Sequence, residues 1–445
     1  MASHTQWKNI RLGDVAKVIS GFAFKSKDFQ QEGIPIIKIK NIRVGSVDLS
    51  EIDHVDSSFL SLDTKYHVKG GDILISLTGS HLTQPNSVVG RVALYSSSLG
   101  HCLLNQRAGK IIITKPDICD KLFLFYSIYT EEKRREIALM ALGAASQANV
   151  SPSQVESVEM KLPPLSIQRK TAAILSAYDR LIENNTRRIE ILEEMARSIY
   201  REWFVKFRFP GHEQVQMVDS ELGLIPEDWE VLPIDELIKR GILEKNQDGN
   251  HGEKHPKSTD YVPSGIPFIM AKDLYTNIID LHNCQFISSE QAQSLRVGFA
   301  KPGDVLLTHK ATMGRVAIVP QVESFIVLTP QITYFRIKDY SLLNQAFLYC
   351  TFTSDRFQDI LSGQSDQSTR KFISITNQRN IKILYPSPNW INKFGEIIKD
   401  VLGLKESLYS KNLNLRKTRD LLLPRLISGE IDVENLDINT GEIAA

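Results

Sequence analysis

The sequence predicts an α+β protein with two duplicated α+β domains, separated by two long helices that pair as an antiparallel coiled coil. Three observations predict this fold: an ordered internal repeat, short β-branched segments bounded by turn residues, and two long runs with coiled-coil spacing. The expected boundaries are a first domain at 1–163, a central long helix at 164–210, a second domain at 211–388, a distal long helix at 389–429 and an acidic tail at 430–445.

The internal repeat consists of motifs that recur in the same order. The matching pairs are Gly33-Ile34-Pro35 with Gly265-Ile266-Pro267 and Gly71-Asp72 with Gly303-Asp304 at an offset of 232, Gly90-Arg91-Val92-Ala93 with Gly314-Arg315-Val316-Ala317, Phe123-Leu124 with Phe347-Leu348 and Pro164 with Pro388 at 224, and Gly143 and Gln147 with Gly363 and Gln367 at 220. Where the offset falls from 232 to 224, the first copy has eight extra residues. They lie within residues 76–89, whose Ser, Thr, Gly, Asn and Pro content is typical of a loop. Such loops on a shared scaffold commonly carry binding specificity.

Within each copy, short apolar segments predict strands and a longer one predicts a helix. The expected strands are residues 34–39, 72–77, 91–95 and 110–114 in the first copy and 266–271, 304–308, 315–319 and 332–337 in the second. Helical periodicity is expected over residues 121–142. Each copy is therefore expected to mix helices and strands.

The two long helices are predicted by apolar positions that alternate at spacings of three and four. The first seam is Ile182, Asn185, Ile189, Leu192, Ala196, Ile199 and Trp203, and the second is Phe394, Ile398, Val401, Lys405, Leu408, Asn412, Leu415 and Leu422. The first helix is expected from residue 166 to about 204, roughly 55–60 Å, before Pro210-Gly211. The second is expected to end near Leu423, where Pro424 interrupts it. The alternative is that each helix packs only on its own domain.

Two asparagines and the chain order suggest how the helices would pair. Asn185 and Asn412 lie on the seams, where asparagine typically fixes the register of a coiled coil. Antiparallel pairing would relate the two domains by a pseudo-two-fold axis. Because dimeric DNA-binding proteins use such symmetry to contact two spaced half-sites, one chain could imitate a dimer here.

Composition excludes several classes of protein. The 445 residues carry a formal net charge of +1, and acidic residues collect in the tail after Gly429. The four cysteines, Cys102, Cys119, Cys284 and Cys350, show no paired spacing and are expected to be buried or incidental thiols. No signal peptide or membrane span is expected, so the predicted location is the cytoplasm.

Motifs that would carry chemistry are absent from the sequence. There is no glycine-rich phosphate loop, no Asn/Asp-Pro-Pro-aromatic tetrapeptide of amino-methyltransferases and no His/Cys cluster with metal spacing. His251 and His255 are expected to be solvated in a charged loop. The Gly71-Asp72 and Gly303-Asp304 pairs are expected to be turns that open strands, because neither is followed by the Glu-x-Lys of a nuclease.

Three segments carry a family resemblance. Ile225-Pro226-Glu227-Asp228-Trp229 opens the second copy, Leu162-Pro163-Pro164-Leu165 with Ile167-Gln168 precedes the first helix, and Leu422-Leu423-Pro424-Arg425-Leu426-Ile427-Ser428-Gly429 lies near the end. Together with the two-copy layout, they resemble the DNA-specificity (S) subunit of Type I restriction–modification systems over roughly residues 7–433. The second linker, Tyr385-Pro386-Ser387-Pro388-Asn389-Trp390, departs from the family pattern because no Gln follows it.

The resemblance implies a non-catalytic DNA-binding subunit. It implies that 1–163 and 211–388 are target-recognition domains, each contacting one half of an interrupted double-stranded DNA target. It implies that two adenine-N6 methyltransferase subunits assemble on the helices, with or without motor-nuclease (restriction) subunits. S-adenosylmethionine would be bound by those methyltransferase subunits, and no cofactor is expected in this chain. The alternatives are a self-sufficient DNA-modifying enzyme with an unrecognised active site and a coiled-coil scaffold that binds no DNA.

Candidate DNA-contacting residues are polar or basic residues in the turns of each copy. Arg and Lys suit guanine and phosphate, whereas Asn and Gln suit adenine. The candidates in the first copy are Lys38, Lys40, Asn41, Arg43, Ser80, His81, Gln84, Asn86, Arg91, Asn105, Gln106, Arg107, Lys110, Ser146 and Gln147, with Asn149 beside them. Those in the second copy are Lys272, His309, Lys310, Thr312, Arg315, Gln331, Gln364, Gln367, Ser368, Arg370 and Lys371. Arg91 and Arg315 belong to the shared frame and could equally be structural.

Overall fold

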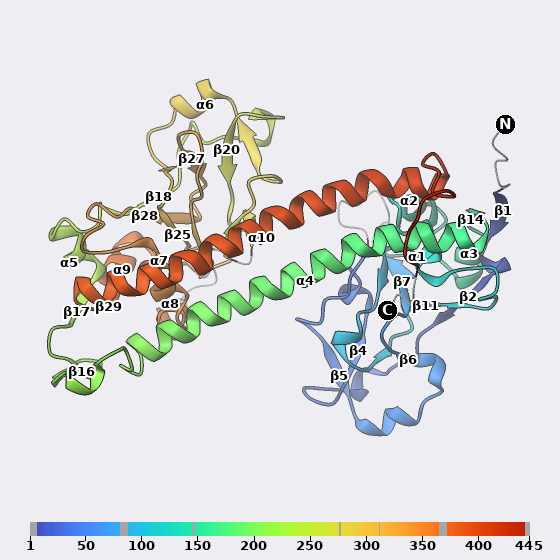
Figure 1. Cartoon of the computed structure of the whole chain (residues 1–445), viewed down its shortest axis with the longest axis horizontal. Coiled ribbons are helices and arrows are strands. Elements are labelled where there is room, and N and C mark those ends of the chain that lie inside the picture. Colours follow the sequence, from blue (N-terminus) through green and yellow to red (C-terminus); the bar gives the residue numbers. More distant parts are fainter. Residues whose placement is uncertain are drawn as a thin grey trace. The chain divides into compact units, whose positions relative to one another are not determined.

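The chain forms two compact units (Figure 1). The computed structural model describes residues 7–80, 88–144, 147–275, 277–310, 312–364 and 372–440. Unit 1 comprises Met1–Asn184 with Asn412–Ala445, and unit 2 comprises Asn185–Lys411. The long helices α4 (Leu165–Phe204) and α10 (Pro388–Ser428) each contribute one part to each unit.

Unit 1 contains a five-stranded sheet and a four-stranded sheet. Their strand orders are β3-β5-β4-β10-β6 and β2-β11-β7-β9, with a parallel pair between β4 and β10. A three-stranded sheet β12-β13-β8 and the antiparallel pair β1-β14 complete the unit. The strands are β1 (Lys8–Arg11), β2 (Ala16–Ser20), β3 (Phe29–Gln30), β4 (Ile34–Ile37), β5 (Asp53–Val55), β6 (His67–Val68), β7 (Ile73–Ser76), β8 (Thr78–Gly79), β9 (Val92–Leu94), β10 (Cys102–Leu104), β11 (Ala108–Ile113), β12 (Leu142–Ala144), β13 (Gln147–Asn149) and β14 (Glu159–Leu162).

Unit 2 repeats the strand order of the two larger sheets. Its five-stranded sheet has the order β19-β23-β20-β27-β24, its four-stranded sheet the order β18-β28-β25-β26, and its β20 and β27 are again parallel. The strands are β15 (Met217–Ser220), β16 (Gly223–Pro226), β17 (Glu230–Pro233), β18 (Gln247–Asp248), β19 (Tyr261–Val262), β20 (Ile266–Ile269), β21 (Leu274–Tyr275), β22 (Ile278–Ile279), β23 (Gln285–Ile287), β24 (Phe299–Ala300), β25 (Val305–Thr308), β26 (Val316–Ile318), β27 (Ile326–Leu328), β28 (Ile332–Phe335) and β29 (Lys382–Tyr385). The predicted duplication of an α+β domain is confirmed.

The repeated Gly-Asp motif forms the same turn in both units. Gly71 and Gly303 have φ values of 80° and 88°, a left-handed conformation that favours glycine. The backbone N–H of Lys69 donates to the Asp72 carboxylate at 3.0 Å, and that of Lys301 donates to the Asp304 carboxylate at 2.7 Å. Both turns lead directly into a buried strand, as the sequence predicts.

Residues 121–142 form two helices where one was expected. Helix α1 (Lys121–Tyr129) ends at Thr130, whose hydroxyl then caps α2 (Glu131–Leu139) by accepting from the Lys133 N–H. A threonine in an extended conformation at this position stops one helix and starts the next, and hydrophobic periodicity does not reveal such a break. Unit 2 has the corresponding α7 (Gln345–Thr353) and α8 (Asp355–Gln364), and its shorter helices are α5 (Ile234–Lys239), α6 (Ser289–Gln293) and α9 (Ile375–Asn380), with α3 (Pro152–Glu156) in unit 1.

Within each unit, segments of α4 and α10 pack side by side and run antiparallel (Figure 1). In unit 1 the buried Asn412 amide donates to the Ile182 carbonyl at 3.2 Å. In unit 2 Ile189 and Leu192 pack against Leu408 in one buried cluster. The predicted seam positions Ile182, Ile189, Leu192, Leu408 and Asn412 therefore lie at the contact between the helices, and Asn412 makes the polar contact expected of a register-setting residue.

The prediction that Pro424 ends the second helix is wrong. Helix α10 continues through Pro424 to Ser428. The continuation has a packing reason, because Leu423 and Leu426 are buried in the core of unit 1. Burial of these side chains offsets the lost backbone hydrogen bond at the proline.

All four cysteines are free and buried, as predicted. None of the helices in the residues described above combines the length and the hydropathy that a membrane-spanning segment requires.

Candidate nucleic-acid interface

In unit 1, three of the predicted polar segments meet around Leu77. The Leu77 N–H donates to the Arg107 carbonyl at 2.9 Å, and the Leu77 carbonyl accepts from Val150 N–H at 2.9 Å. These bonds bring together the start of the extra loop, the turn before β11 and the segment after the Gly143-to-Gln147 stretch. Strand β8 extends the contact, since Thr78 pairs with Asn149 and its hydroxyl donates to the Asn149 side chain at 2.7 Å.

The same three segments meet around His309 in unit 2. The His309 N–H donates to the Gln331 carbonyl at 2.9 Å, and the His309 carbonyl accepts from Ile373 N–H at 3.0 Å. Lys310 then forms a bridge with Phe372. We define the interface of each unit by these segments: residues 77–80, 105–107 and 147–150 in unit 1, and residues 309, 310, 312, 329–331 and 372–373 in unit 2.

A buried hydroxyl anchors the variable loop of each interface. Ser76 Oγ accepts from the Arg91 N–H at 3.0 Å, and Thr308 Oγ1 accepts from the Arg315 N–H at 2.9 Å. The hydroxyls in turn donate to carbonyls inside their loops, those of Val88 and Thr312. The two loops of unequal length therefore start and end on the same frame. Ser80 is half-buried and Thr312 is exposed, whereas His81, Gln84 and Asn86 lie outside the described residues.

The turn before β11 places Arg107 and Gln331 at the same position of the repeat. Gln106 and Arg107 are exposed and Gln331 is half-buried. Among the described residues no ion pair engages Arg107. Asn105, by contrast, is only 6% exposed, and its side chain accepts from the Arg107 N–H at 3.3 Å. Arg107 and Gln331 are thus available to a ligand, while Asn105 shapes the turn.

The loop after β4 in unit 1 and the loop after β20 in unit 2 carry further candidates. Lys38 and Lys40 both form ion pairs with Asp53, at 3.0 and 3.2 Å, and Arg43 pairs with Asp48 at 3.0 Å. Asn41 is 2% exposed, and its side-chain amide nitrogen donates to the carbonyls of Asp48 and Glu51. We therefore leave Asn41 out of the interface.

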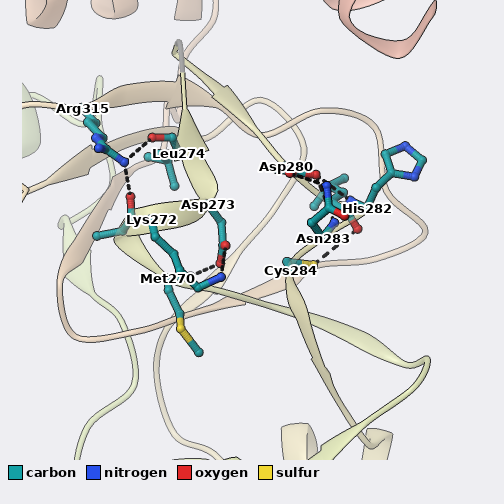
Figure 2. A network of polar contacts seen from close by, with 11 residues as sticks. Met270, Lys272, Asp273, Leu274, Asp280, His282, Asn283, Cys284 and Arg315 are labelled. Atoms are coloured by element: carbon teal, nitrogen blue, oxygen red, sulfur yellow. Dashed lines mark hydrogen bonds and ion pairs between the residues drawn. The ribbon is translucent and has the colours of Figure 1, made fainter. Parts of the chain in front are cut away.

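In unit 2 the corresponding loop, after β20, accepts hydrogen bonds from the Arg315 side chain (Figure 2). The Arg315 guanidinium donates to the carbonyls of Ala271 and Leu274 at 3.1 and 3.0 Å. Lys272 is 60% exposed and pairs with Asp273 at 2.6 Å, and Asp273 also accepts from the Met270 N–H. These contacts favour a structural role for Arg315 over contact with DNA.

Arg91 differs from its counterpart. It is half-buried, and its Nε has no hydrogen-bond partner among the described residues. Burial, with the nearby Arg43 and Arg134, lowers the pKa of Arg91. Arg91 therefore stays a candidate, whereas Lys110 is 6% exposed, donates to the His67 carbonyl at 2.6 Å and lies 3.6 Å from Asp72. We leave Lys110 out.

Several candidates fall where little can be described. Ser146, Gln367, Ser368, Arg370 and Lys371 lie outside the described residues, and for Gln147 and Gln364 only the backbone is described.

Phe372 is an interface residue that the sequence reasoning missed. It is 50% exposed and lies beside the exposed Lys310. Its position directly after Arg370-Lys371 was the available signal. An exposed aromatic ring beside a cation suits an apolar base edge next to a phosphate.

His309 is buried at the centre of its interface. It is 6% exposed, and its Nδ1 lies 3.0 Å from the Ile373 carbonyl, so Nδ1 carries the proton of the neutral ring. Burial lowers the pKa of His309 below its ordinary 6.5. His309 therefore holds the segments together from inside, and we do not assign it a base contact.

The buried imidazole predicts a pH dependence of stability. Because the folded pKa lies below the unfolded one, the unfolded state binds the extra proton. The contribution of the neutral His309 to the free energy of unfolding is fully present above pH 6.5 and is lost as pH falls through the folded pKa. Leu77 stands at the equivalent position of unit 1, so His309→Leu should flatten this dependence. Urea unfolding between about pH 7.5 and pH 5 measures it, and an unchanged slope in the variant would contradict the assignment.

Of the two histidines expected to be solvated, His251 is and His255 is only partly so. His251 is exposed, and His255 is half-buried with its Nδ1 2.9 Å from the Asn250 carbonyl. Among the residues that the structure describes, no group of three or more His, Cys, Asp or Glu side chains could hold a metal ion.

Comparison with known proteins identifies the family. The model for the "Type I restriction modification DNA specificity domain" matches residues 4–194 and again 226–409, once for each copy of the repeat. The chain belongs to this family. It is 25% identical over 438 residues to the MjaVIII specificity subunit of Methanocaldococcus jannaschii, covering 97% of this chain and 94% of that one. It is 22% identical over 469 residues to the EcoBI specificity subunit of Escherichia coli, covering 100% and 91%.

A solved structure agrees on the fold. The S subunit of a Type I system from M. genitalium superimposes with a TM-score of 0.57 at 15% identity, covering 96% of this chain and 97% of that one. This protein is thus a specificity subunit, a non-catalytic DNA-recognition component that functions with other subunits of a Type I restriction–modification complex.

Proposed function

We propose that this specificity subunit recognises an interrupted, bipartite DNA target, with one half-site contacted by the interface of each unit. Two methyltransferase subunits dock on the paired helices and transfer a methyl group to adenine N6. They bind the S-adenosylmethionine, and this chain supplies the choice of site. Motor-nuclease subunits join the complex in systems that also restrict.

The repeated interface is the observation that supports two half-sites. The same three segments meet in both units through the same backbone hydrogen bonds around Leu77 and His309. The side chains they present differ, since Arg107 in unit 1 is replaced by Gln331 in unit 2. Arginine suits guanine and glutamine suits adenine, so the two half-sites should differ in sequence.

Exposed apolar residues on the helices support partner docking. In unit 2, Ile191 and Met195 of α4 are 51% and 46% exposed, and Ile397 and Leu404 of α10 are 44% and 41% exposed. Residues four or seven apart share one face of a helix. Both helices therefore carry exposed apolar side chains outside the seam between them. Such surface is more stable when a protein partner covers it than when it faces water.

Mapping N6-methyladenine across a genome with and without the gene tests the proposal. We expect one interrupted, asymmetric motif that disappears with the gene. A continuous motif, or none, would overturn the bipartite target. Methylation by the isolated chain would instead indicate a self-sufficient enzyme, and no DNA binding in complex with the methyltransferase would indicate a scaffold.

Removing either of the turn residues Arg107 and Gln331 should affect one half-site at a time. Arg107→Ala and Gln331→Ala are each expected to cost about 1–3 kcal/mol at one base pair, in opposite half-sites. Binding of the methyltransferase complex to targets with single substitutions measures this. The exposed Lys239 of α5 provides a control, since Lys239→Ala should leave both half-sites unchanged. Equal losses at both half-sites in either variant would contradict the assignment.

A further inference from the structure

Gly45 and Asn277 occupy the same position of the repeat, at the offset of 232, in the loops that follow β4 and β20. Both are left-handed, with φ values of 85° and 55°. Such a conformation is uncommon for a residue other than glycine. Each loop carries interface candidates, Lys40 in unit 1 and Lys272 in unit 2. The two residues thus mark the same bend in both of the loops that flank the interfaces.

In unit 2, Asn277 contacts a buried cation from the helix pair. The ammonium group of Lys405 on α10 donates to Glu193 of α4 at 3.0 Å, to the Asn277 carbonyl at 3.2 Å and to the hydroxyl of Tyr349 on α7 at 3.1 Å. The side chains of Lys405 and Glu193 are only 5% and 11% exposed. The three donors of the ammonium group therefore join both long helices, a domain helix and the loop. We call these four residues the unit-2 cluster.

Unit 1 has a cluster of the same kind. Arg419 on α10 forms an ion pair with Asp179 of α4 and donates to the hydroxyl of Tyr129 on α1 at 3.3 Å. Gly45 lies against the Tyr129 ring so closely that a Cβ there would be 2.9 Å from a ring carbon. Tyr126 donates its hydroxyl to Asp179 as well. In this unit-1 cluster the loop touches the tyrosine, and the tyrosine touches the cation.

Both clusters share one plan: an acid on α4, a cation on α10, a tyrosine on the corresponding helix α1 or α7, and the left-handed loop residue. The plan recurs although Lys405 and Arg419 are not equivalent positions of the repeat. Burial raises the pKa of both Tyr349 and Tyr129, so their hydroxyls stay protonated and can accept from the cations.

Stability alone is a weak reason for such clusters. A buried ion pair often contributes no more to folding than apolar residues of the same size would. What it adds is directional contact, because each hydrogen bond fixes the relative placement of two elements. Here the elements are the helix pair, where we place the methyltransferase subunits, and the loop beside the DNA interface.

We propose that Lys405 and Arg419, together with Tyr349 and Tyr129, are positioning residues that set the loop beside the DNA interface of each unit against the helix pair. The proposal rests on the bipartite function above. It makes each cluster specific to one half-site: the unit-2 cluster acts on the half-site of Gln331, and the unit-1 cluster on that of Arg107.

Two conservative variants test it in the intact methyltransferase complex. Tyr349→Phe removes one hydroxyl and places phenylalanine where unit 1 already has Phe125. Tyr129→Phe removes the corresponding hydroxyl from the unit-1 cluster. We expect Tyr349→Phe to reduce discrimination against single-base substitutions in the Gln331 half-site by at least about fivefold, and to leave the other half-site unchanged. Tyr129→Phe should show the reverse, and Tyr340→Phe, at an exposed tyrosine, should change neither.

The outcomes separate the proposal from a merely structural role. A lower melting temperature with unchanged discrimination, or equal losses at both half-sites, would overturn it. Should a tyrosine variant fold poorly, Glu193→Met/Lys405→Met removes the charges of the unit-2 cluster together and must show the same half-site selectivity. A wild-type complex without a bipartite motif would refute the proposed function itself, so the two failures are distinguishable.

Discussion

Lys405→Met is expected to lower the free energy of unfolding of unit 2 by about 3–5 kcal/mol. The substitution removes the nearer cation of Glu193, an 11% exposed carboxylate whose other ion pair, with Arg197, is longer at 3.7 Å. It also removes the donor to Asn277 and Tyr349. A charge inside a protein that loses its close partner costs more than the pair contributed, because its water is not replaced. Denaturant unfolding of the full chain measures the loss.

The matched control removes both charges. Glu193→Met/Lys405→Met should recover most of the stability lost in the single variant, because no charge then remains buried. An exposed pair provides the contrast: Arg201 and Glu194 are 47% and 59% exposed, and Arg201→Met should cost less than about 1 kcal/mol. If the double variant were as unstable as Lys405→Met, the penalty would not come from the unpaired carboxylate.

The architecture could be predicted because it depends on periodic patterns. Spacings of three and four place Ile189, Leu192 and Leu408 on one seam wherever the rest of the chain goes. Repeated motifs such as Gly71-Asp72 and Gly303-Asp304 impose the same turn in each copy, since only glycine adopts that backbone conformation cheaply. Element ends were less predictable, because they depend on one cap, as at Thr130, or on tertiary burial, as at Pro424.

The roles of individual polar residues could be predicted only in part. The sequence shows which side chains can donate or accept, but not where they point. Arg107 and Arg315 looked alike as DNA candidates, yet the first is exposed and the second donates to carbonyls more than 40 positions away. Lys405 was visible as a charge on a seam, but its partner Glu193 lies 212 positions earlier. Pairings at such separations follow from the fold and leave no local signature.

The charge distribution of the helices also supports their pairing. The acids of the two clusters, Asp179 and Glu193, lie on α4, and their cations, Arg419 and Lys405, lie on α10. Pairing of α4 with a second α4, or of α10 with a second α10, would bring like charges together or leave them unpaired. This costs several kcal/mol per ion, on the order of the penalty expected for Lys405→Met. Complementary charges therefore favour α4 with α10 over either helix with itself.

The aromatic cluster that joins the helices to the second domain carries the other large effect. Phe394 of α10 is fully buried, with ring centroids 6.0 Å from Tyr200, 5.0 Å from Phe204 and 6.4 Å from Phe347. Tyr200 and Phe204 belong to α4 and Phe347 to α7. One ring therefore holds three elements of unit 2, and neither long helix can leave the domain without exposing it.

Phe394→Ala is accordingly expected to cost about 3–5 kcal/mol, from lost burial and from the cavity left among rings that cannot collapse freely. The loss should be local to unit 2. Hydrogen exchange should show faster opening of α7 in the variant and unchanged protection of α1. Ile397, three residues along α10 and 44% exposed, is the matched control, and Ile397→Ala should change stability by no more than about 0.5 kcal/mol. Equal deprotection of α1 and α7 would show that the two units unfold as one, and would contradict a separate anchor for each domain.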